Sequence, residues 1–281
     1  MAAHRYVVCD VFTDRPLAGN QLAVFTDARG LAEEQLQPLA REVNFSETVY
    51  CYPAEGDGHA RIRIFTPASE LAFAGHPVLG TAFVLAGPLQ LAEILLETRA
   101  GTIPVRLERE GSKIVFGWMQ QLVPTVEPCA QEAELLAALR IERSELPVEL
   151  YDNGLRNVFL CLRTADEVAA IEPDLARLAR IQGVVGTNCF AAAGSRWKTR
   201  MFAPADGVPE DPATGSAAGP LAVHLVRHGL VQPSEEIEIQ QGVEVRRPST
   251  LYARVEGSPG AVERVEVGGQ AVIVGRGEFR L

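Results

Sequence analysis

Two glycine-containing segments stand where apolar runs begin, and each would offer backbone N–H groups to a ligand. Gly75-His76-Pro77 opens one run and Thr214-Gly215-Ser216 opens another. The first four N–H groups of a helix have no partner within it, and the helix dipole favours an anion there. One such segment would more often be a simple turn. Two at matching places in a repeat favour a binding site for a carboxylate.

Three titratable side chains near these segments are candidates for moving a proton. Glu47 stands at the start of the strand-like run TVYCY, a position where an exposed carboxylate is the commoner outcome. Burial in an apolar cleft would instead raise its pKa and make it a base near neutral pH. His76 is either a core or helix-start histidine or a group that orients a substrate. Asp211 either caps the following helix or contacts substrate.

No segment carries a strong pattern for a metal or a nucleotide. His224 and His228 have ligand spacing, but the residues between them lack the Glu of a metalloprotease motif, and Arg227 would repel a cation. We interpret the pair as ordinary histidines near a helix end. The five cysteines form no CxxC, and no phosphate-binding glycine motif follows a strand. We expect no metal and no organic cofactor.

Composition limits the classes of partner. The chain has 281 residues, 47% of them hydrophobic, and a formal net charge of -10, which is typical of a globular protein. This acidity argues against nucleic acid and anionic membranes, although a local pocket can still bind an anionic small molecule. The N-terminus becomes charged too early for a signal peptide, and no apolar run approaches the ~20 residues of a spanning helix. We expect a cytoplasmic protein without membrane contact.

Short β-branched or aromatic runs bounded by turn residues predict that strands dominate the chain. The predicted strands lie near 5–12, 21–25, 48–52, 59–65, 93–98, 102–108, 113–118, 148–152, 157–162, 183–190, 197–202 and 270–280. The predicted helices lie at 31–43, 76–87, 131–140, 173–180 and 216–229. The helix at 76–87 is apolar on every side and the one at 216–229 mostly so, which predicts that both are buried.

The two halves of the sequence share one pattern. Residues 63–80 and 200–217 each read as a strand ending in Arg-x-Phe-x-Pro, an acidic loop and a glycine-containing start of an apolar helix. This repeat predicts an α+β fold of two similar β-rich domains related by duplication, each a mixed sheet or barrel around a central helix. A proline-containing break at 119–130 sets the predicted domains at 1–119, completed by the strand at 270–281, and at 130–269. Across a two-fold axis, both helix starts would open on one cleft.

Several segments in the same order resemble the phenazine-biosynthesis isomerase (PhzF-like) family, which has a diaminopimelate-epimerase-like fold. They span nearly the whole chain, and the last two are the specific ones: Asp10-Val11-Phe12 with Gly19-Asn20, Ser46-Glu47-Thr48, Phe65-Thr66-Pro67, Phe73-Ala74-Gly75-His76-Pro77, and Gly207 with Glu210-Asp211-Pro212-Ala213-Thr214-Gly215-Ser216-Ala217. The resemblance implies an isomerase with Glu47 as catalytic acid/base and with His76, Asp211 and Ser216 around a small carboxylate substrate. We also expect the substrate to be bound by Asn20, Ser46, Gly75, Thr214 and Gly215. The resemblance to the family also implies a homodimer.

Two alternatives to a proton-shifting isomerase stay open on the sequence. A racemase or epimerase would return the proton to the same carbon and would need a second acid/base, for which Asp211 and His76 are the candidates. Diaminopimelate epimerase uses a cysteine at each helix start, and this chain has none there. The other alternative is a binding or scaffold protein that has lost its chemistry. The presence of Glu47 together with His76 and Asp211 argues against it.

Overall fold

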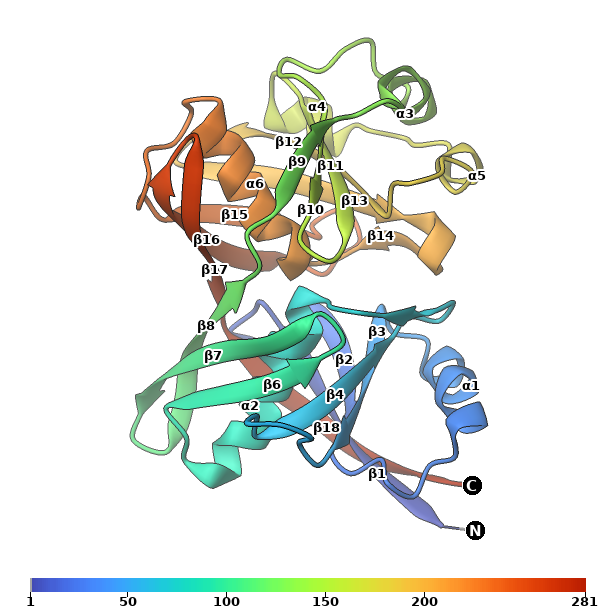
Figure 1. The fold of residues 1–281 in the computed structure, drawn as a ribbon. Helices are drawn as coiled ribbons and strands as arrows, with labels where there is room; N and C mark the ends of the chain where they lie inside the picture. The colour runs from blue at the N-terminus through green and yellow to red at the C-terminus, as the bar shows by residue number, and fades with distance from the viewer. Residues whose placement is uncertain (1) are drawn as a thin grey trace. The chain divides into compact units, whose positions relative to one another are not determined.

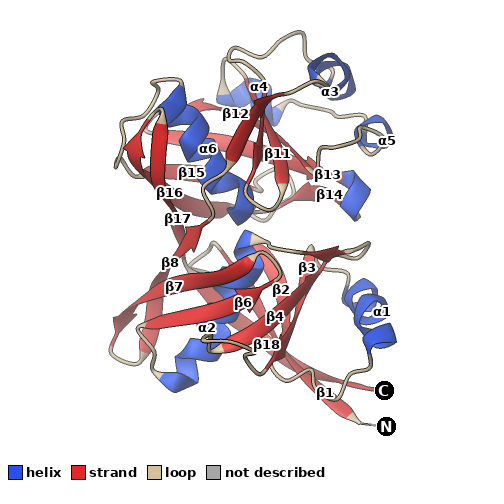
Figure 2. Cartoon of the chain, in the orientation of Figure 1, coloured by secondary structure: helices blue, strands red, loops and turns tan. Residues whose placement is uncertain are grey.

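The computed structural model of the protein describes residues 2–281, which divide into two compact units (Figures 1 and 2). Unit 1 comprises residues 2–120 with Gly268–Leu281, and unit 2 comprises Gln121–Val267. The predicted domain limits stay a prediction, because contacts within a unit do not show that it folds by itself. No helix among residues 2–281 is long and apolar enough to span a membrane.

Unit 1 is a curled mixed sheet around one helix. Its elements are β1 (Ala3–Val11), β2 (Asn20–Phe25), α1 (Glu33–Val43), β3 (Glu47–Tyr52), β4 (Ala60–Phe65), β5 (Glu70–Leu71), α2 (Gly75–Leu89), β6 (Glu93–Thr98), β7 (Gly101–Glu110), β8 (Lys113–Gln121) and β18 (Ala271–Arg280). The strands pair in the order β18-β1-β2-β3-β4-β6-β7-β8, parallel at β2–β3 and β4–β6 and antiparallel elsewhere. The C-terminal strand β18 thus completes the sheet of the first unit.

Helix α2 is the buried centre of unit 1. Nearly all of its residues from Gly75 to Ala86 are buried, as its apolar sequence predicts. Gly80 permits this close packing, because a Cβ there would lie 2.7 Å from side-chain atoms of Val11 and Leu22 and 3.2 Å from the Cys9 sulfur. The sheet can therefore bring the start of α2 close to the first residues of β2 and β3.

Unit 2 repeats this topology. Its elements are β9 (Thr125–Pro128), α3 (Glu132–Leu139), β10 (Glu149–Asp152), β11 (Arg156–Cys161), α4 (Ala165–Ala169), α5 (Leu175–Leu178), β12 (Gly186–Ala193), β13 (Arg196–Ala203), a 3-10 turn (Pro204–Asp206), β14 (Val208–Asp211), α6 (Gly215–Arg227), β15 (Ile237–Gln241), β16 (Ser249–Ser258) and β17 (Ala261–Gly269). The order β9-β10-β11-β12-β13-β15-β16 has parallel pairs at β11–β12 and β13–β15, which match β2–β3 and β4–β6. Helix α6 takes the place of α2. The predicted α+β fold of two similar β-rich halves is confirmed.

The repeated Arg-x-Phe-x-Pro pattern makes the same contacts in both units. Arg63 of β4 pairs with Glu70 of β5, with Nε and Oε1 2.8 Å apart. Arg200 of β13 pairs with Glu210 of β14, with Nε and Oε1 2.9 Å apart. Each guanidinium also lies over the Phe two residues further on, at 5.2 and 5.0 Å from the ring centroid. This device fixes the short strand that leads into each central helix.

Two details differ from the sequence prediction. The helix predicted at 173–180 is only the four-residue α5, which begins after the N-cap Asp174 and ends before the C-cap Ala179; α4 was not predicted. The break at 119–130 is not an open linker. It contains the end of β8 and the whole of β9, whose Val126 lies opposite Tyr151 of β10.

Candidate active site

Glu47 is the first residue of β3, where its backbone lies beside Leu22 of the parallel strand β2. Its side chain is only 12% exposed. The commoner alternative for a carboxylate at a strand start, full exposure to solvent, therefore does not hold. The strand therefore places this carboxylate beside the start of α2.

His76, the second residue of α2, lies beside that carboxylate. Its Nε2 is 3.3 Å from Glu47 Oε2. The ring is 2% exposed, and burial lowers the pKa of His76 to about 3. The imidazole is therefore neutral at pH 7. It places a neutral polar ring against the Glu47 carboxylate, and it cannot serve as a cationic acid.

Asn20, the first residue of β2, holds the other side of this ring. It is 1% exposed, and its Nδ2 lies 3.1 Å from His76 Nδ1. Asn20 thus holds the ring in the orientation in which Nε2 faces Glu47. The three side chains form a chain of contacts within unit 1. Asn20 was predicted to bind substrate, and the contact that we observe is with His76.

The start of α2 has the features expected of an anion site. Its N-cap residue is Ala74, whose side chain cannot accept a hydrogen bond from the first N–H groups. Gly75 carries no side chain to cover them. Ser46 directly precedes β3 and is partly buried. Binding of substrate by Ser46 and Gly75 stays a prediction.

In unit 2, Asp211 ends β14 and is 6% exposed. Its Oδ2 accepts a hydrogen bond of 2.6 Å from the Thr214 hydroxyl. Thr214 is the N-cap residue of α6, yet its side chain makes no cap hydrogen bond. The hydroxyl that could have capped α6 is thus turned to Asp211.

Gln241, at the end of β15, holds this turn in place and was not predicted as a site residue. Its Nε2 donates to the Thr214 hydroxyl at 2.9 Å and to the Asp211 carbonyl at 2.8 Å. Its Oε1 accepts from the Thr214 N–H at 3.2 Å and from the Thr199 hydroxyl at 3.2 Å. One buried amide therefore sets the positions of both predicted site residues.

The first turn of α6 is held by two further buried amides that were not predicted. Gln121 Nε2 donates to the Gly215 carbonyl at 2.7 Å, and Asn153 Nδ2 donates to the Ser216 carbonyl at 2.9 Å. Both bonds engage carbonyl groups, so they leave the N–H groups of Gly215 and Ser216 for a ligand. No motif or residue spacing in the sequence marks a single Gln or Asn in a strand-like run as a residue that holds the start of a helix.

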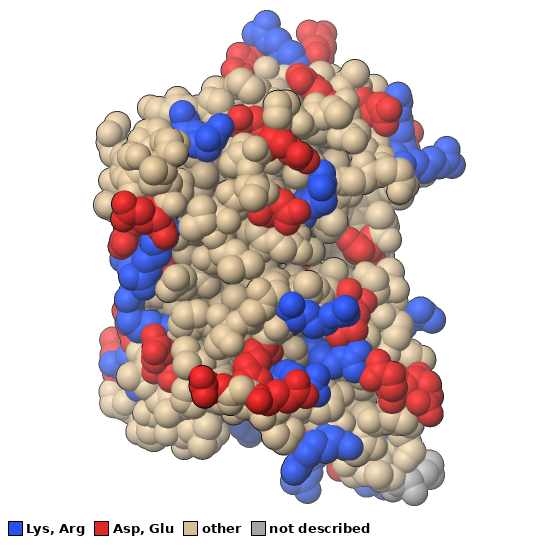
Figure 3. All heavy atoms as spheres, viewed as in Figure 1, with Lys and Arg blue, Asp and Glu red and all other residues tan. Residues whose placement is uncertain are grey.

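Unit 2 also has a hollow away from these residues. It has a volume of about 530 Å³ and contains none of the predicted site residues. Two of the three arginines on its wall are paired with neighbouring carboxylates, with Arg143 3.0 Å from Glu145 and Arg163 2.7 Å from Glu167. Lys and Arg side chains are interspersed with Asp and Glu over the face in Figure 3. That face shows no broad basic surface for a polyanion.

Comparison with known proteins identifies a family whose sequence pattern matches this chain. The model of the family described as phenazine biosynthesis-like protein matches residues 9–277 of the chain. A trans-2,3-dihydro-3-hydroxyanthranilate isomerase of Pseudomonas aeruginosa is 50% identical over 278 residues, which are 99% of this chain and 100% of that protein.

Solved structures are similar over the full length. A phenazine biosynthesis protein of the PhzF family from Bacillus anthracis has a TM-score of 0.85 at 24% identity and covers 100% of both chains. A hydroxyproline epimerase from Agrobacterium vitis has a TM-score of 0.70 at 14% identity, covering 98% of this chain and 92% of that one. At these identities the likeness concerns the fold alone, and the predicted epimerase-like fold is confirmed.

Proposed function

Because the chain belongs to the family of phenazine biosynthesis-like proteins and is an isomerase, we propose that Glu47 moves a proton within a small carboxylate substrate. One observation carries this proposal: a largely buried carboxylate lies 3.3 Å from the Nε2 of a histidine that is neutral at pH 7. A neutral partner orients a base without lowering its basicity as a cation would.

The proposed substrate is a ring acid of the trans-2,3-dihydro-3-hydroxyanthranilate type, the compound in the name of the 50% identical relative. Its C3 bears both a hydroxyl and a hydrogen, and it is joined through the ring double bonds to the carboxylate. Removing that proton leaves an electron pair that spreads along the double bonds toward the carboxylate. Returning the proton to another ring carbon gives an isomer with the same atoms and no net oxidation.

In this scheme Glu47 both takes and returns the proton. The neutral ring of His76 lies against the carboxylate and limits its movement, and Asn20 holds that ring in place. The N–H groups of Gly75 and His76 at the start of α2 are suited to the carboxylate whose negative charge must be stabilised. A transfer between two carbons of one molecule needs no oxidant or reductant, so we propose that no cofactor takes part.

Ser46 and, from unit 2, Asp211, Thr214, Gly215 and Ser216 are proposed to bind the substrate. The buried positions of Asp211, Thr214 and Ser216 and their fastening by amide side chains support this assignment. A preorganised set of donors loses little freedom when substrate binds. Ser216→Ala should therefore raise KM more than it lowers kcat.

We further propose a homodimer that acts in the cytoplasm. The resemblance of the site segments to the family supports the dimer. Light scattering of the purified protein gives the mass directly: twice 30.4 kDa is expected, and a monomer mass across the working concentration range would contradict the proposal.

Replacement of Glu47 by Gln tests the catalytic assignment. The amide keeps the shape of the side chain but cannot accept a proton from carbon, so turnover should fall by at least ~10²–10⁴-fold. Glu93→Gln is the matched control, because Glu93 also begins a strand but is exposed. Wild-type turnover by Glu47→Gln, or an equal loss in both variants, would refute the assignment.

A further inference from the structure

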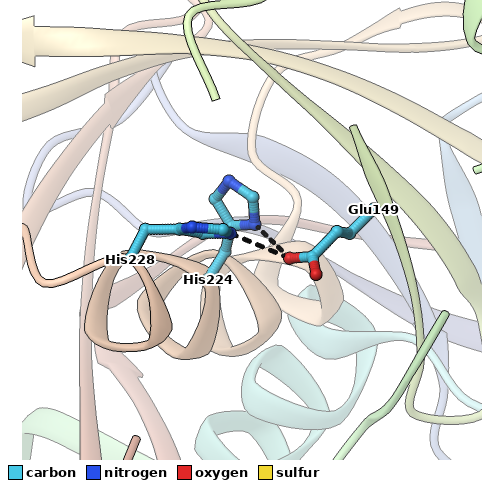
Figure 4. Close-up of side chains that lie close together, drawn as sticks. All are labelled: Glu149, His224 and His228. Atoms are coloured by element: carbon cyan, nitrogen blue, oxygen red, sulfur yellow. Dashed lines mark hydrogen bonds and ion pairs between the residues drawn. The ribbon is translucent and has the colours of Figure 1, made fainter. Parts of the chain in front are cut away.

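The C-terminal end of α6 carries a second cluster of side chains that the proposed reaction does not use. His224 and His228 lie one turn apart on α6, and Glu149 reaches them from the start of β10 (Figure 4). One donor atom from each of the three lies within 4.8 Å of the other two. All three residues belong to unit 2, and they lie at the opposite end of α6 from Gly215.

The sequence separates Glu149 from the histidines, which is why the histidine pair alone did not indicate a site. A metalloprotease motif supplies its Glu between the histidines, and here β10 supplies one from outside the helix. Glu149 Oε2 lies 3.4 Å from His224 Nδ1 and 3.0 Å from His228 Nε2. Ligand atoms of a tetrahedral zinc ion with bonds of ~2.0–2.1 Å are about 3.4 Å apart. The cluster therefore has nearly the spacing that such an ion requires.

The surroundings favour a positive ion at this place in two ways. The last turn of a helix bears the negative end of the helix dipole, and both histidines stand on or just after that turn. His224 is fully buried, while the His228 side chain is 20% exposed. One ligand is thus held rigidly among aromatic rings, and the other leaves a path for an ion from solvent.

Arg227 is the strongest argument against a cation, and its geometry weakens that argument. Its Nη2 lies 3.3 Å from Glu149 Oε1, the carboxylate oxygen that does not face the histidines. Its side chain is 35% exposed, so solvent screens much of its charge. The Tyr151 hydroxyl lies 2.9 Å from Glu149 Oε2 and 3.0 Å from His224 Nδ1. An ion must replace these hydrogen bonds, which makes its affinity moderate.

We propose that Glu149, His224 and His228 bind one transition-metal ion of the Zn²⁺ class, with water in the remaining position. Two imidazoles and one carboxylate are a donor set that such ions prefer. The ion ties the end of α6 to β10 and thereby stabilises unit 2. It takes no part in proton transfer by Glu47.

Titration of the chelator-treated, tag-free protein with Zn²⁺ and with Co²⁺ tests the site. We expect one ion per chain, a rise in the melting temperature with Zn²⁺, and the visible absorption bands of tetrahedral Co²⁺. His228→Gln should weaken Zn²⁺ binding by at least ~10-fold and abolish the Co²⁺ bands. His59→Gln, which changes an exposed histidine of unit 1, should leave both signals unchanged.

The result that would overturn the proposal is equally direct. Wild-type protein that shows neither saturable Zn²⁺ binding nor Co²⁺ bands has no such site, and wild-type affinity in His228→Gln places the ion elsewhere. Circular dichroism confirms the fold of each variant. If His228→Gln is unfolded, Glu149→Gln gives the same decision, because it removes the charged ligand and keeps the side-chain shape.

Discussion

Asn20 holds the ring of His76 beside Glu47, so a charge placed at position 20 should act on Glu47 through that ring. The Asn20 amide nitrogen lies 3.1 Å from Nδ1, and Nε2 on the other side of the ring lies 3.3 Å from Glu47 Oε2. Burial keeps the ring neutral, with a pKa of about 3. In wild type, titration of His76 should therefore cause no change in rate between pH 5 and 8.

Asn20→Asp should reverse this arrangement. A carboxylate beside Nδ1 favours the imidazolium ion and raises the pKa of His76 from its low value. As the pH falls through the raised pKa, His76 becomes a cation, holds Glu47 as a carboxylate and lowers its basicity. The acidic limb of the kcat profile should move to higher pH than in wild type.

Asn20→Ala separates this charge effect from simple loss of a contact. It should lower kcat without moving the acidic limb, because it adds no charge. Superimposable pH profiles for wild type and Asn20→Asp, with both proteins folded, would show that Asn20 does not control the state of His76.

At the scale of elements, the central helices were the most predictable part of the fold. The apolar composition of 76–87 and 216–229 located α2 and α6 to within two residues at each end. A helix that is buried on all sides needs an apolar residue at nearly every position, and such a run is recognisable in a single sequence. The short α4 and α5 lack it, since helices of four or five residues are set by tertiary contacts.

The candidate site could be predicted only in part, for a related reason. Glu47 and His76 stand in recognisable segments, and their contact is an outcome of the fold. Gln241 and Asn153 act through single amide groups whose partners are 27 and 63 residues away along the chain. No local pattern distinguishes such an amide from a surface one. Glu149 was missed in the same way, because its partners His224 and His228 come from α6.

Glycine substitutions in α2 test its packing against the sheet. Gly80→Ala places a methyl group 2.7 Å from Val11 and Leu22 atoms, and overpacking of this kind should destabilise the protein by ~1–3 kcal/mol. Gly87→Ala, in the same helix, meets no atom within 4 Å apart from its chain neighbours, so it should destabilise the protein less than Gly80→Ala does. Urea unfolding gives both values. Equal effects of the two changes would contradict the packing of α2 that we describe.

At the scale of the whole molecule, the two units differ in how many segments of the chain they contain. Unit 2 is one continuous segment, whereas unit 1 needs β18 from the C-terminus to pair with β1 along nine residue positions.

The racemase alternative loses support when whole chains are compared, because the relative at 50% identity is named an isomerase and the epimerase at 14% identity shares only the fold.

This division predicts how fragments should behave. A fragment of residues 121–267 should fold cooperatively, while residues 1–120 should not, because β1 would lose its partner β18. A synthetic peptide of residues 268–281, added to the 1–120 fragment, should restore structure. Circular dichroism and amide NMR spectra give the result. Cooperative unfolding of 1–120 alone would contradict the role assigned to β18.

The central claim is that Glu47 is the one base that exchanges a proton with the substrate carbon. Solvent deuterium incorporation into trans-2,3-dihydro-3-hydroxyanthranilate, followed by mass spectrometry in D₂O, tests it most directly. We predict that wild type and the Glu93→Gln control incorporate deuterium at carbon, and that folded Glu47→Gln, which still binds the substrate, incorporates none above the uncatalysed background. Continued incorporation by Glu47→Gln would show that another residue removes the proton and would contradict the account.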